Sequence, residues 1–365
     1  MVRVTRARSP SRRIEVVKGR RRTTSQQVAV RAGVSRSTVS FVLNNVPNMS
    51  FTEETRKRVL EAAEELGYVP NAAAQMLVSG ETRTIGLVVS HAEHFSVDAF
   101  IPQLLYSLSR DAHALGYRVL LETIEDVSQP NAYDDLVRGQ RIDGLIVLNT
   151  RSDDSQLPEL IRKNFPVVLL GFPEWAKLGE RAGAIWTDGR AAGHVATQHL
   201  IDLGHSRVAH ITFSPEQYHA TQDRHLGWRD ALLAAGLSDA GLLEYGNYSA
   251  ASGFAAMQKL LERKQRPTAL FAGNDTIAMG AMAAIHQHGL RIPEDIAVVG
   301  YDDIPTAPYM VPPLTTICVS ALEHGHEAVK SLNELLQGER PSVLVKTLET
   351  PLVIRESCGA TAPKD

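Results

Sequence analysis

The strongest constraint on the fold is an alternation that repeats along the chain after residue 83. Short apolar runs, each the length of one buried strand, alternate with amphipathic segments that end at Gly116, Gly204, Gly236 and Gly289. The apolar runs are residues 85–89, 118–121, 144–148, 167–170, 208–211, 269–272 and 297–300. Strands that are apolar on both faces are typical of parallel sheets that helices cover on both sides. We therefore expect a series of βαβ units, and roughly 270 residues of this pattern are enough for two lobes.

The composition is that of an ordinary globular protein. Of the 365 residues, 44% are hydrophobic and 22% are charged, which allows a large core and argues against a fibrous or wholly disordered chain. No apolar stretch approaches the ~18 residues of a membrane span, and the N-terminus lacks the apolar core of a secretory signal. The chain has only Cys318 and Cys358, so no disulfide framework is expected. These features predict a cytoplasmic protein that does not bind a membrane.

Charge is distributed unevenly along the chain. Residues 1–83 carry 15 Lys or Arg against 7 Asp or Glu, whereas the remaining residues carry 23 against 34. The whole basic excess lies in residues 1–22, which show no helical or strand periodicity, and we expect them to form a disordered basic tail. The tail is interpreted either as a nonspecific phosphate-binding arm or as a solvated leader, and an organellar transit peptide is a third interpretation.

Residues 23–69 show three short helical patterns. The first has a small apolar face and ends at Gly33, whose missing Cβ suits a left-handed stop. Ser35 is a suitable N-cap for the second pattern and Thr52 for the third. Two short helices that are joined by a turn and braced by a third are typical of a helix-turn-helix domain, whose second helix lies in the DNA major groove.

Several motifs, in order along the chain, resemble the LacI/GalR (lactose-repressor) family. They include VRAGVSRSTVSFVLN at 30–44, LGYVPN at 66–71, HLIDLGH at 199–205, GND at 273–275, VVGYDD at 298–303 and PPLTT at 312–316. The resemblance covers about residues 24–355. It implies a homodimeric transcription regulator, usually a repressor, that binds a palindromic operator in double-stranded DNA. It also implies a small-molecule effector, and the expected effector is a sugar.

The expected fold class is a small all-α helix-turn-helix head plus an α/β two-lobed core of parallel sheets, like a type I periplasmic binding protein. A hinge helix and linker are expected between the head and the core, and the chain is expected to cross between the lobes near residues 187, 302 and 320. The expected domains are the tail at 1–22, the head at 23–69, the hinge and linker at 70–83, the effector-binding and dimerisation core at 84–356, and a C-terminal tail at 357–365.

The resemblance assigns base reading to the exposed start of the second helix, at Arg36, Ser37 and Phe41. Phe41 stands where the family commonly has Arg, so the operator half-site should differ, because a phenyl ring donates no hydrogen bond to a base. Leu77 is interpreted as a wedge that enters the minor groove, or alternatively as a linker residue packed on the core. The full expected DNA-contact set is Ser35, Arg36, Ser37, Thr38, Ser40, Phe41, Asn44, Asn71, Ala74 and Leu77.

Ligands of parallel α/β sheets bind beyond the carboxyl ends of the strands. The resemblance implies that Arg224, Asn274 and Asp302 hydrogen-bond effector hydroxyls there, and that Tyr248 stacks on a sugar face. His94, Phe95 and Trp186 are expected to line the opposite lobe. A structural role stays open for each of these residues, and Asp275 is either a ligand contact or a helix N-cap. Gly171 and Ala321 stand where some family members have an acidic and an aromatic contact, so no particular sugar is implied.

Two other classes of function fit the sequence less well. An α/β enzyme is not supported, because the chain has no GxGxxG after a strand, no GxxxxGK[ST] and no GxSxG. His324, His326 and Glu327 lack the HExxH spacing of a zinc site, and the two histidines are predicted to face solvent at the start of a helix. A secreted solute-binding protein would need a signal peptide and no DNA-binding head. We therefore expect neither catalysis nor a cofactor or metal.

Overall fold

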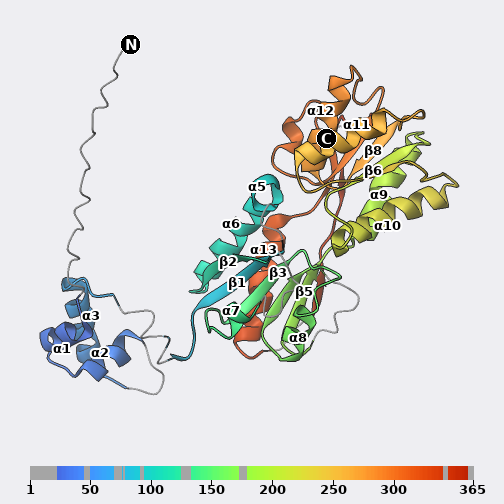
Figure 1. The fold of residues 1–365 in the computed structure, drawn as a ribbon. Coiled ribbons are helices and arrows are strands. Elements are labelled where there is room, and N and C mark those ends of the chain that lie inside the picture. Colours follow the sequence, from blue (N-terminus) through green and yellow to red (C-terminus); the bar gives the residue numbers. More distant parts are fainter. Residues whose placement is uncertain are drawn as a thin grey trace, which may run out of the picture. The chain divides into compact units, whose positions relative to one another are not determined.

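The computed structural model describes residues 23–44, 50–69, 76, 79–90, 94–124, 133–171, 179–339 and 344–360 (Figure 1). The chain divides into two compact units, Met1–Glu81 and Thr82–Asp365. Each unit is described by itself.

Within its described residues, the first unit includes the helices α1 (Ser25–Ala32), α2 (Arg36–Leu43) and α3 (Glu53–Glu65). Each begins at a hydroxyl side chain that accepts a hydrogen bond from a backbone N–H of the first turn: Thr24, Ser35 and Thr52. Helix α1 ends at Gly33, in the left-handed conformation with φ 64°.

The core of the head is small and built from one face of each helix. Val28, Val39 and Val59 are fully buried at its centre, and the alanines of α1 and α3 let the helices approach closely. The amphipathic spacing of these residues therefore explains why α1 and α2 pack across the turn at Gly33 and Val34, with α3 bracing both.

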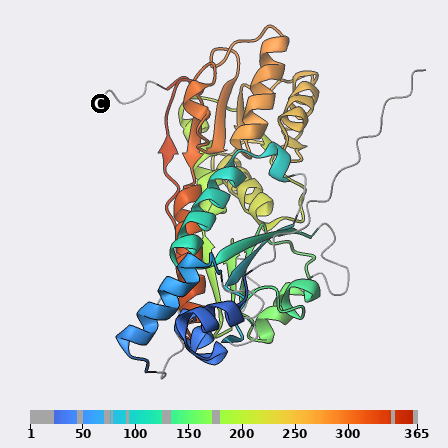
Figure 2. The ribbon, with the colours of Figure 1, turned by 90° about the vertical axis from the view of Figure 1, so that its left-hand side faces the viewer.

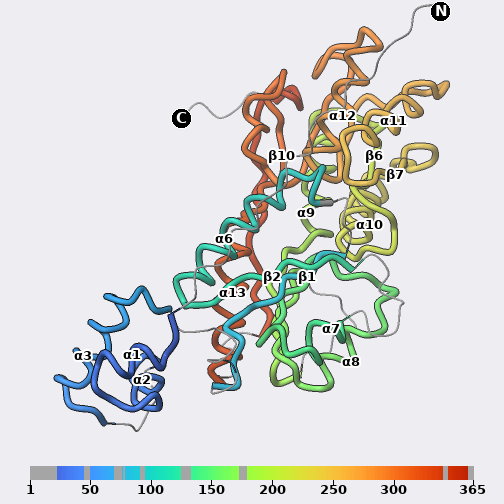
Figure 3. Tube along the Cα trace, turned by 60° about the vertical axis from the view of Figure 1, so that its left-hand side comes forward, coloured from blue at the N-terminus to red at the C-terminus, as the bar shows by residue number. Residues whose placement is uncertain are grey.

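The second unit contains two six-stranded sheets, one in each lobe. In the first lobe the strand order is β11-β5-β4-β3-β1-β2. The bounds are β1 Thr84–Val89, β2 Arg118–Thr123, β3 Gly144–Leu148, β4 Val167–Leu170, β5 Ala182–Trp186 and β11 Val345–Thr347. Its helices are α5 His94–Val97, α6 Phe100–Ala114, α7 Asp134–Val137, α8 Leu157–Arg162 and α13 Ala321–Leu336. Helices α6 and α13 lie side by side on one face of this sheet (Figure 3).

In the second lobe the strand order is β12-β10-β9-β8-β6-β7. The bounds are β6 Val208–Thr212, β7 Leu243–Tyr245, β8 Ala269–Ala272, β9 Ala297–Asp302, β10 Thr315–Cys318 and β12 Leu352–Val353. Its helices are α9 Gly189–Asp202, α10 His219–Ala234, α11 Ala250–Leu261 and α12 Asp275–Gln287, with a 3-10 turn η1 at Ala307–Tyr309. Strand β12 runs antiparallel to β10, and the other described strand pairs of both sheets are parallel.

Alternate strand residues feed two separate cores in the first lobe. Ile85, Leu87 and Val89 face α6 and α13, whereas Val88 faces the side covered by α7 and α8. Because helices cover both faces of the sheet, side chains at successive strand positions are buried. This explains the continuous apolar runs of the sequence.

The chain crosses between the lobes three times: between β5 and α9, between β10 and α13, and between β11 and β12. The red C-terminal segment makes the last crossing (Figure 2). The crossing expected near residue 302 is wrong, because β9 and β10 are neighbouring parallel strands of one sheet. The polar residues after β9 mark the end of a strand and not a change of lobe.

Candidate functional site

A pocket lies between the two lobes of the second unit. The first lobe supplies residues where its central strands end, namely Leu148, Asn149, Thr150, Leu170, Gly171, Trp186 and Thr187. The second lobe supplies Gly189 of α9, Tyr301 of β9, and His219, Ala220, Asp223 and Arg224 of α10. The pocket encloses about 710 Å³ of empty space, part of it open to solvent.

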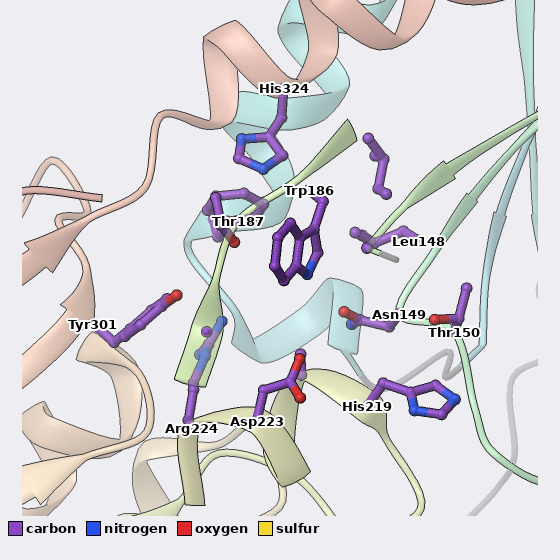
Figure 4. A pocket seen from close by; sticks show the side chains of 15 residues that line it. Leu148, Asn149, Thr150, Trp186, Thr187, His219, Asp223, Arg224, Tyr301 and His324 are labelled. Carbon is purple, nitrogen blue, oxygen red and sulfur yellow. The ribbon is translucent and has the colours of Figure 1, made fainter. Parts of the chain in front are cut away.

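Two helices of the first lobe complete the pocket wall. Phe100 of α6 and His324 of α13 both line the pocket, and Figure 4 shows the side chain of His324 pointing toward Trp186. The rings of Phe100 and His324 meet edge to face, with centroids 6.2 Å apart. The pocket is therefore partly aromatic, which suits a ligand with apolar ring faces and polar edges.

Arg224 is held in one orientation by contacts on all sides. Its guanidinium carbon lies 3.5 Å from the ring centroid of Tyr301 and 4.3 Å from that of Phe213. Its Nη1 donates a hydrogen bond to the Gly273 carbonyl, and its Nη2 lies 3.9 Å from Asp302 Oδ1. The Nε atom of Arg224 is buried and has no hydrogen-bond partner among the described residues. Because this atom is closed off from solvent, a ligand oxygen reaches it only if a neighbouring group moves.

Asp302 lies behind Arg224 and does not line the pocket. Burial raises the pKa of the Asp302 carboxyl, and the Arg224 guanidinium opposes that shift. Asp302 therefore acts on the pocket through Arg224, by helping to fix the position of the guanidinium.

The other residues expected to bind effector in the second lobe are buried away from the pocket wall. Asn274 caps α12, since its Oδ1 accepts from Ile277 N at 2.8 Å, and its Nδ2 lies 3.4 Å from Asp98 Oδ2 of the first lobe. Tyr248 is 1% exposed and packs edge-on against Phe213. Direct ligand contact by Asn274 and Tyr248 stays a prediction.

Asp275 is not the helix N-cap, because Asn274 takes that position. Its two carboxyl oxygens accept hydrogen bonds from Ile304 N at 2.9 Å and from the Thr316 hydroxyl at 2.6 Å. Asp275 does not line the pocket, and it ties α12 to the segment after β9 and to β10.

The residues expected on the first-lobe wall are also divided. Trp186 lines the pocket at the end of β5, and its side chain is half-buried. Phe95 packs against the core of the first lobe and does not line the pocket. His94 begins α5, and its side chain lies outside the described residues.

Sequence reasoning missed several lining residues. Asn149, Thr150 and Thr187 come directly after strands, so the rule that ligands bind at carboxyl ends of strands could have found them. The prediction that His324 faces solvent is wrong, because its side chain is 7% exposed and lies on the pocket wall. The prediction holds for His326, whose side chain is 56% exposed. Nothing in the local sequence separates the two histidines, because the return of α13 to the first lobe places His324.

A short backbone bridge joins the lobes beside the pocket. Ser152 N donates to the Gln217 carbonyl at 2.9 Å, and His219 N donates to the Thr150 carbonyl at 3.3 Å. Between these bonds, Arg151 and Tyr218 oppose each other as an antiparallel pair, with the guanidinium carbon 5.2 Å from the ring centroid. The bridge connects the lobes at the side where Thr150 and His219 reach the pocket.

In the head, the predicted DNA-contact residues of α2 and its ends are on the surface or half-buried. Ser35, Arg36 and Ser37 are exposed, and Thr38, Ser40, Phe41 and Asn44 are half-buried. Arg36 Nε donates to Ser25 Oγ at 3.0 Å, which holds the side chain across the start of α1. The hydrophobic residues that pack against the head core do not include Phe41. Asn71, Ala74 and Leu77 lie outside the described residues.

Among the helices of the described residues, none combines the length and apolarity that crossing a membrane requires. Within the same part of the chain, no group of three or more His, Cys, Asp or Glu side chains is arranged to hold a metal ion.

A three-helix head with an exposed second helix, joined to two parallel α/β lobes around a pocket, defines a class of ligand-responsive DNA-binding proteins. Residues 24–71 match the bacterial regulatory proteins of the lacI family, and residues 197–358 match a periplasmic binding protein-like domain. The chain belongs to the lacI family of bacterial regulatory proteins.

Individual relatives match over nearly their whole length. The HTH-type transcriptional regulator CelR of Thermobifida fusca is 36% identical over 93% of this chain and 99% of its own. The HTH-type transcriptional repressor PurR of Aliivibrio fischeri (strain MJ11) is 35% identical over 92% of this chain and 98% of its own. A CelR–cellobiose complex superposes with a TM-score of 0.68 at 35% identity, covering 92% of this chain and all of that one. A lac repressor dimer bound to operator and the anti-inducer ONPF superposes with a TM-score of 0.81 at 31% identity, covering 93% and 100%.

Proposed function

We propose that this protein is a transcriptional repressor that binds a palindromic operator as a homodimer, and that a small sugar binding between the lobes changes its affinity for that operator. It acts in the cytoplasm and catalyses no reaction. The observation that carries the proposal is the pocket itself, which combines side chains of both lobes around the fixed Arg224 guanidinium. The cellobiose complex of the relative CelR supports a sugar.

A ligand in this pocket contacts both lobes, so it favours whichever lobe arrangement offers the better contacts. Arg224 of the second lobe and Trp186 of the first both line the pocket. A ligand bound to both therefore stabilises one relative position of the lobes. An effector that binds one lobe arrangement better must bind differently when DNA selects the other arrangement, because the coupling is reciprocal.

Binding to DNA is assigned to the head. Arg36 and Ser37 are exposed at the start of α2, where the second helix of this motif meets base edges. Thr38 and Ser40 are proposed to contact phosphates and Phe41 to contact a thymine methyl group. Asn44 at the end of α2, with Asn71, Ala74 and Leu77 of the hinge segment, completes the proposed interface. Leu77 is the proposed wedge.

The test is a fluorescence-anisotropy titration on DNA from immediately upstream of the protein's own gene, at several salt concentrations. The ligands are cellobiose, D-glucose, D-ribose and hypoxanthine. We expect nanomolar binding to a palindromic site, weakened at least tenfold by one sugar. Arg224→Ala should abolish that response and leave operator binding within twofold, because Arg224 lies in the core unit. Arg36→Ala should weaken operator binding about tenfold or more, since one good base contact contributes about 1–3 kcal/mol.

Arg229→Ala is the matched control, because Arg229 lies on the same helix as Arg224 with a side chain that is 61% exposed and paired with Asp239. Its response should equal that of the unmodified protein. Binding that is weak, falls steeply with salt and ignores sequence would mean that the basic tail is all that DNA contacts, and would overturn the proposal.

A further inference from the structure

The hydrogen bonding of His324 sets which of its two ring nitrogens carries the proton. Its Nδ1 lies 2.9 Å from the Ser320 carbonyl, one turn earlier in the chain. A carbonyl oxygen only accepts, so Nδ1 carries the proton. In a neutral imidazole the other nitrogen, Nε2, then keeps its lone pair and is an acceptor. Burial lowers the pKa of the His324 ring, which keeps it neutral at pH 7.

The charges around the pocket sum to zero or less. Arg224 is the one Arg or Lys on the described wall, and Asp302 lies 3.9 Å behind it. Asp223 adds a carboxylate to the wall. Burial lowers the pKa of His219, so this ring brings no charge at pH 7. Two helix N-termini reach the pocket: α9 is capped by the Asp188 carboxylate, whereas α10, which begins at His219, has no side-chain cap.

The balance of side-chain charge disfavours an anionic ligand. A phosphate or carboxylate is held most strongly by a cation that no nearby acid offsets, and the described wall supplies no such side chain. The wall instead offers hydrogen-bonding groups of both kinds: the guanidinium of Arg224, whose side chain is 12% exposed, from the second lobe and the Nε2 acceptor of His324 from the first. A hydroxyl group both donates and accepts, so neighbouring hydroxyls of one ring match this pair.

We propose that His324 is a specificity-determining residue of the pocket, and that its Nε2 accepts a hydrogen bond from a hydroxyl of an uncharged sugar. The inference rests on the proposed function, because it concerns the same pocket. The sugar places an apolar ring face against Trp186, which Figure 4 shows near both His324 and Asp223. A second hydroxyl accepts a hydrogen bond from Arg224, so the ligand hydrogen-bonds to one side chain of each lobe.

The test is isothermal titration calorimetry of the full chain with D-glucose, D-ribose, cellobiose, glucose 6-phosphate, ribose 5-phosphate and hypoxanthine. Each is titrated into the unmodified protein and into His324→Leu, His324→Gln, Arg224→Ala and His326→Leu. Leucine removes the acceptor with little change in volume, and glutamine returns an acceptor oxygen. His326→Leu is the matched control, because His326 lies two residues further along α13 with a side chain that is 56% exposed.

We expect one of the uncharged sugars to bind most tightly. His324→Leu should raise its Kd tenfold or more, His324→Gln should recover part of that loss, and His326→Leu should stay within twofold. A deoxy analogue that lacks the hydroxyl facing His324 should bind the unmodified protein as weakly as the parent sugar binds His324→Leu, with no further loss in the variant.

Other results would overturn the proposal. Tightest binding of a phosphate or of hypoxanthine rejects an uncharged sugar, as does binding of none of the sugars. Sugar binding that Arg224→Ala abolishes and His324→Leu leaves intact removes His324 and keeps the proposed function. Sugar binding that neither variant weakens places the ligand elsewhere, and the proposed function fails with the inference.

A second measurement needs no ligand. Long-range ¹H–¹⁵N correlation spectra of histidine-labelled protein at pH 7, assigned with His324→Gln, report which ring nitrogen is protonated. A protonated Nδ1 and a bare Nε2 are expected at His324. A proton on Nε2 leaves no lone pair for a ligand hydroxyl and would overturn the proposal.

Discussion

At the scale of the single residue, Asp275 shows how strongly the fold can act on one group. Its side chain is fully buried at the first residue of α12, and burial raises the pKa of the carboxyl to about 7. The hydrogen bonds from Thr316 and Ile304 oppose this shift without cancelling it. Between pH 4 and pH 7 the folded protein therefore keeps a proton at Asp275 that the unfolded chain releases.

The consequence for stability has a definite sign. Because the folded state binds more protons than the unfolded state in this range, the free energy of unfolding falls as pH rises toward 7, and this contribution is flat above it. Asp275→Asn keeps the shape and removes the titration. From pH 5 to pH 8 the free energy of unfolding of the unmodified protein should fall by about 2 kcal/mol more than that of the variant.

Urea unfolding followed by tryptophan fluorescence measures this difference, because all three Trp residues lie in the two-lobed unit. Asp239→Asn is the control, since that carboxylate is 48% exposed. Equal slopes with pH in the unmodified protein and Asp275→Asn would contradict the assignment of a buried, protonated carboxyl.

Single residues were predictable from the sequence only where local chemistry decides their position. The N-cap role of Ser35 follows from its place before a helical pattern, and the structure has it. Trp186 was expected on the first-lobe wall of the site and lines the pocket, whereas Phe95 turns into the core. That difference, like the burial of His324, is set by which distant helix packs against the segment.

At the scale of the element, α9 and α10 approach each other backbone to backbone. A Cβ at Gly227 of α10 would collide with the Arg190 carbonyl oxygen of α9, and a Cβ at Gly193 of α9 would lie 2.6 Å from the Arg224 carbonyl oxygen. These glycines therefore let α10 lie deep enough for Arg224 to reach the pocket.

Gly227→Ala separates this effect from helix propensity. Alanine in an exposed helix would stabilise the protein by about 1 kcal/mol relative to glycine. Here the clash with the α9 backbone should destabilise the protein by about 3 kcal/mol, and displacement of α10 should weaken effector binding. Leu233→Ala, at a 77% exposed position of α10, should change the stability by less than about 0.5 kcal/mol. Thermal unfolding checks both, and a gain in stability for Gly227→Ala would refute the close approach.

Long buried strands were the elements that the sequence predicted well. The run at residues 144–148 coincides with β3, and the run at 269–272 with β8, because each is apolar along its whole length. The predicted runs did not include β5, β7, β10, β11 and β12. Strands β11 and β12 have only three and two residues with half-buried or exposed side chains, whereas β5 and β10 are mostly buried and were missed all the same. Short edge strands such as β11 and β12 form because the neighbouring strand of an existing sheet supplies backbone groups for them to hydrogen-bond.

At the scale of the whole two-lobed unit, the backbone bridge at Arg151 and Tyr218 is a place where lobe movement can be blocked. This pair lies between the two hydrogen bonds of the bridge, and antiparallel pairs of that kind have Cα atoms about 4.5 Å apart, which suits a disulfide. Arg151→Cys with Tyr218→Cys should cross-link the lobes on oxidation. The oxidised protein should then change its operator affinity less than twofold with effector.

Anisotropy titrations with and without dithiothreitol measure this, and reduction should restore the response. Arg151→Cys alone, treated with the same oxidant, is the control. An oxidised double variant that responds as fully as the reduced one would show that signalling needs no movement at this bridge.

The two-lobed plan was predictable from the strand pattern, but the path of the chain through it was not. The sequence shows where strands end, and both a change of lobe and a simple loop begin at such an end. The crossing between β11 and β12 joins two of the shortest strands, and the apolar pattern does not reveal strands of this length.

The three crossings also decide the order in which the protein is completed during synthesis. The first lobe begins at β1 and waits for α13 and β11, which are among the last segments to leave the ribosome. The second lobe receives its helices α9 to α12 and its central strands in one uninterrupted stretch and lacks only β12. Domains usually fold in the order of their synthesis. In this chain the first lobe, although it is started first, lacks helix α13 on one face until the second lobe has all of its strands except β12.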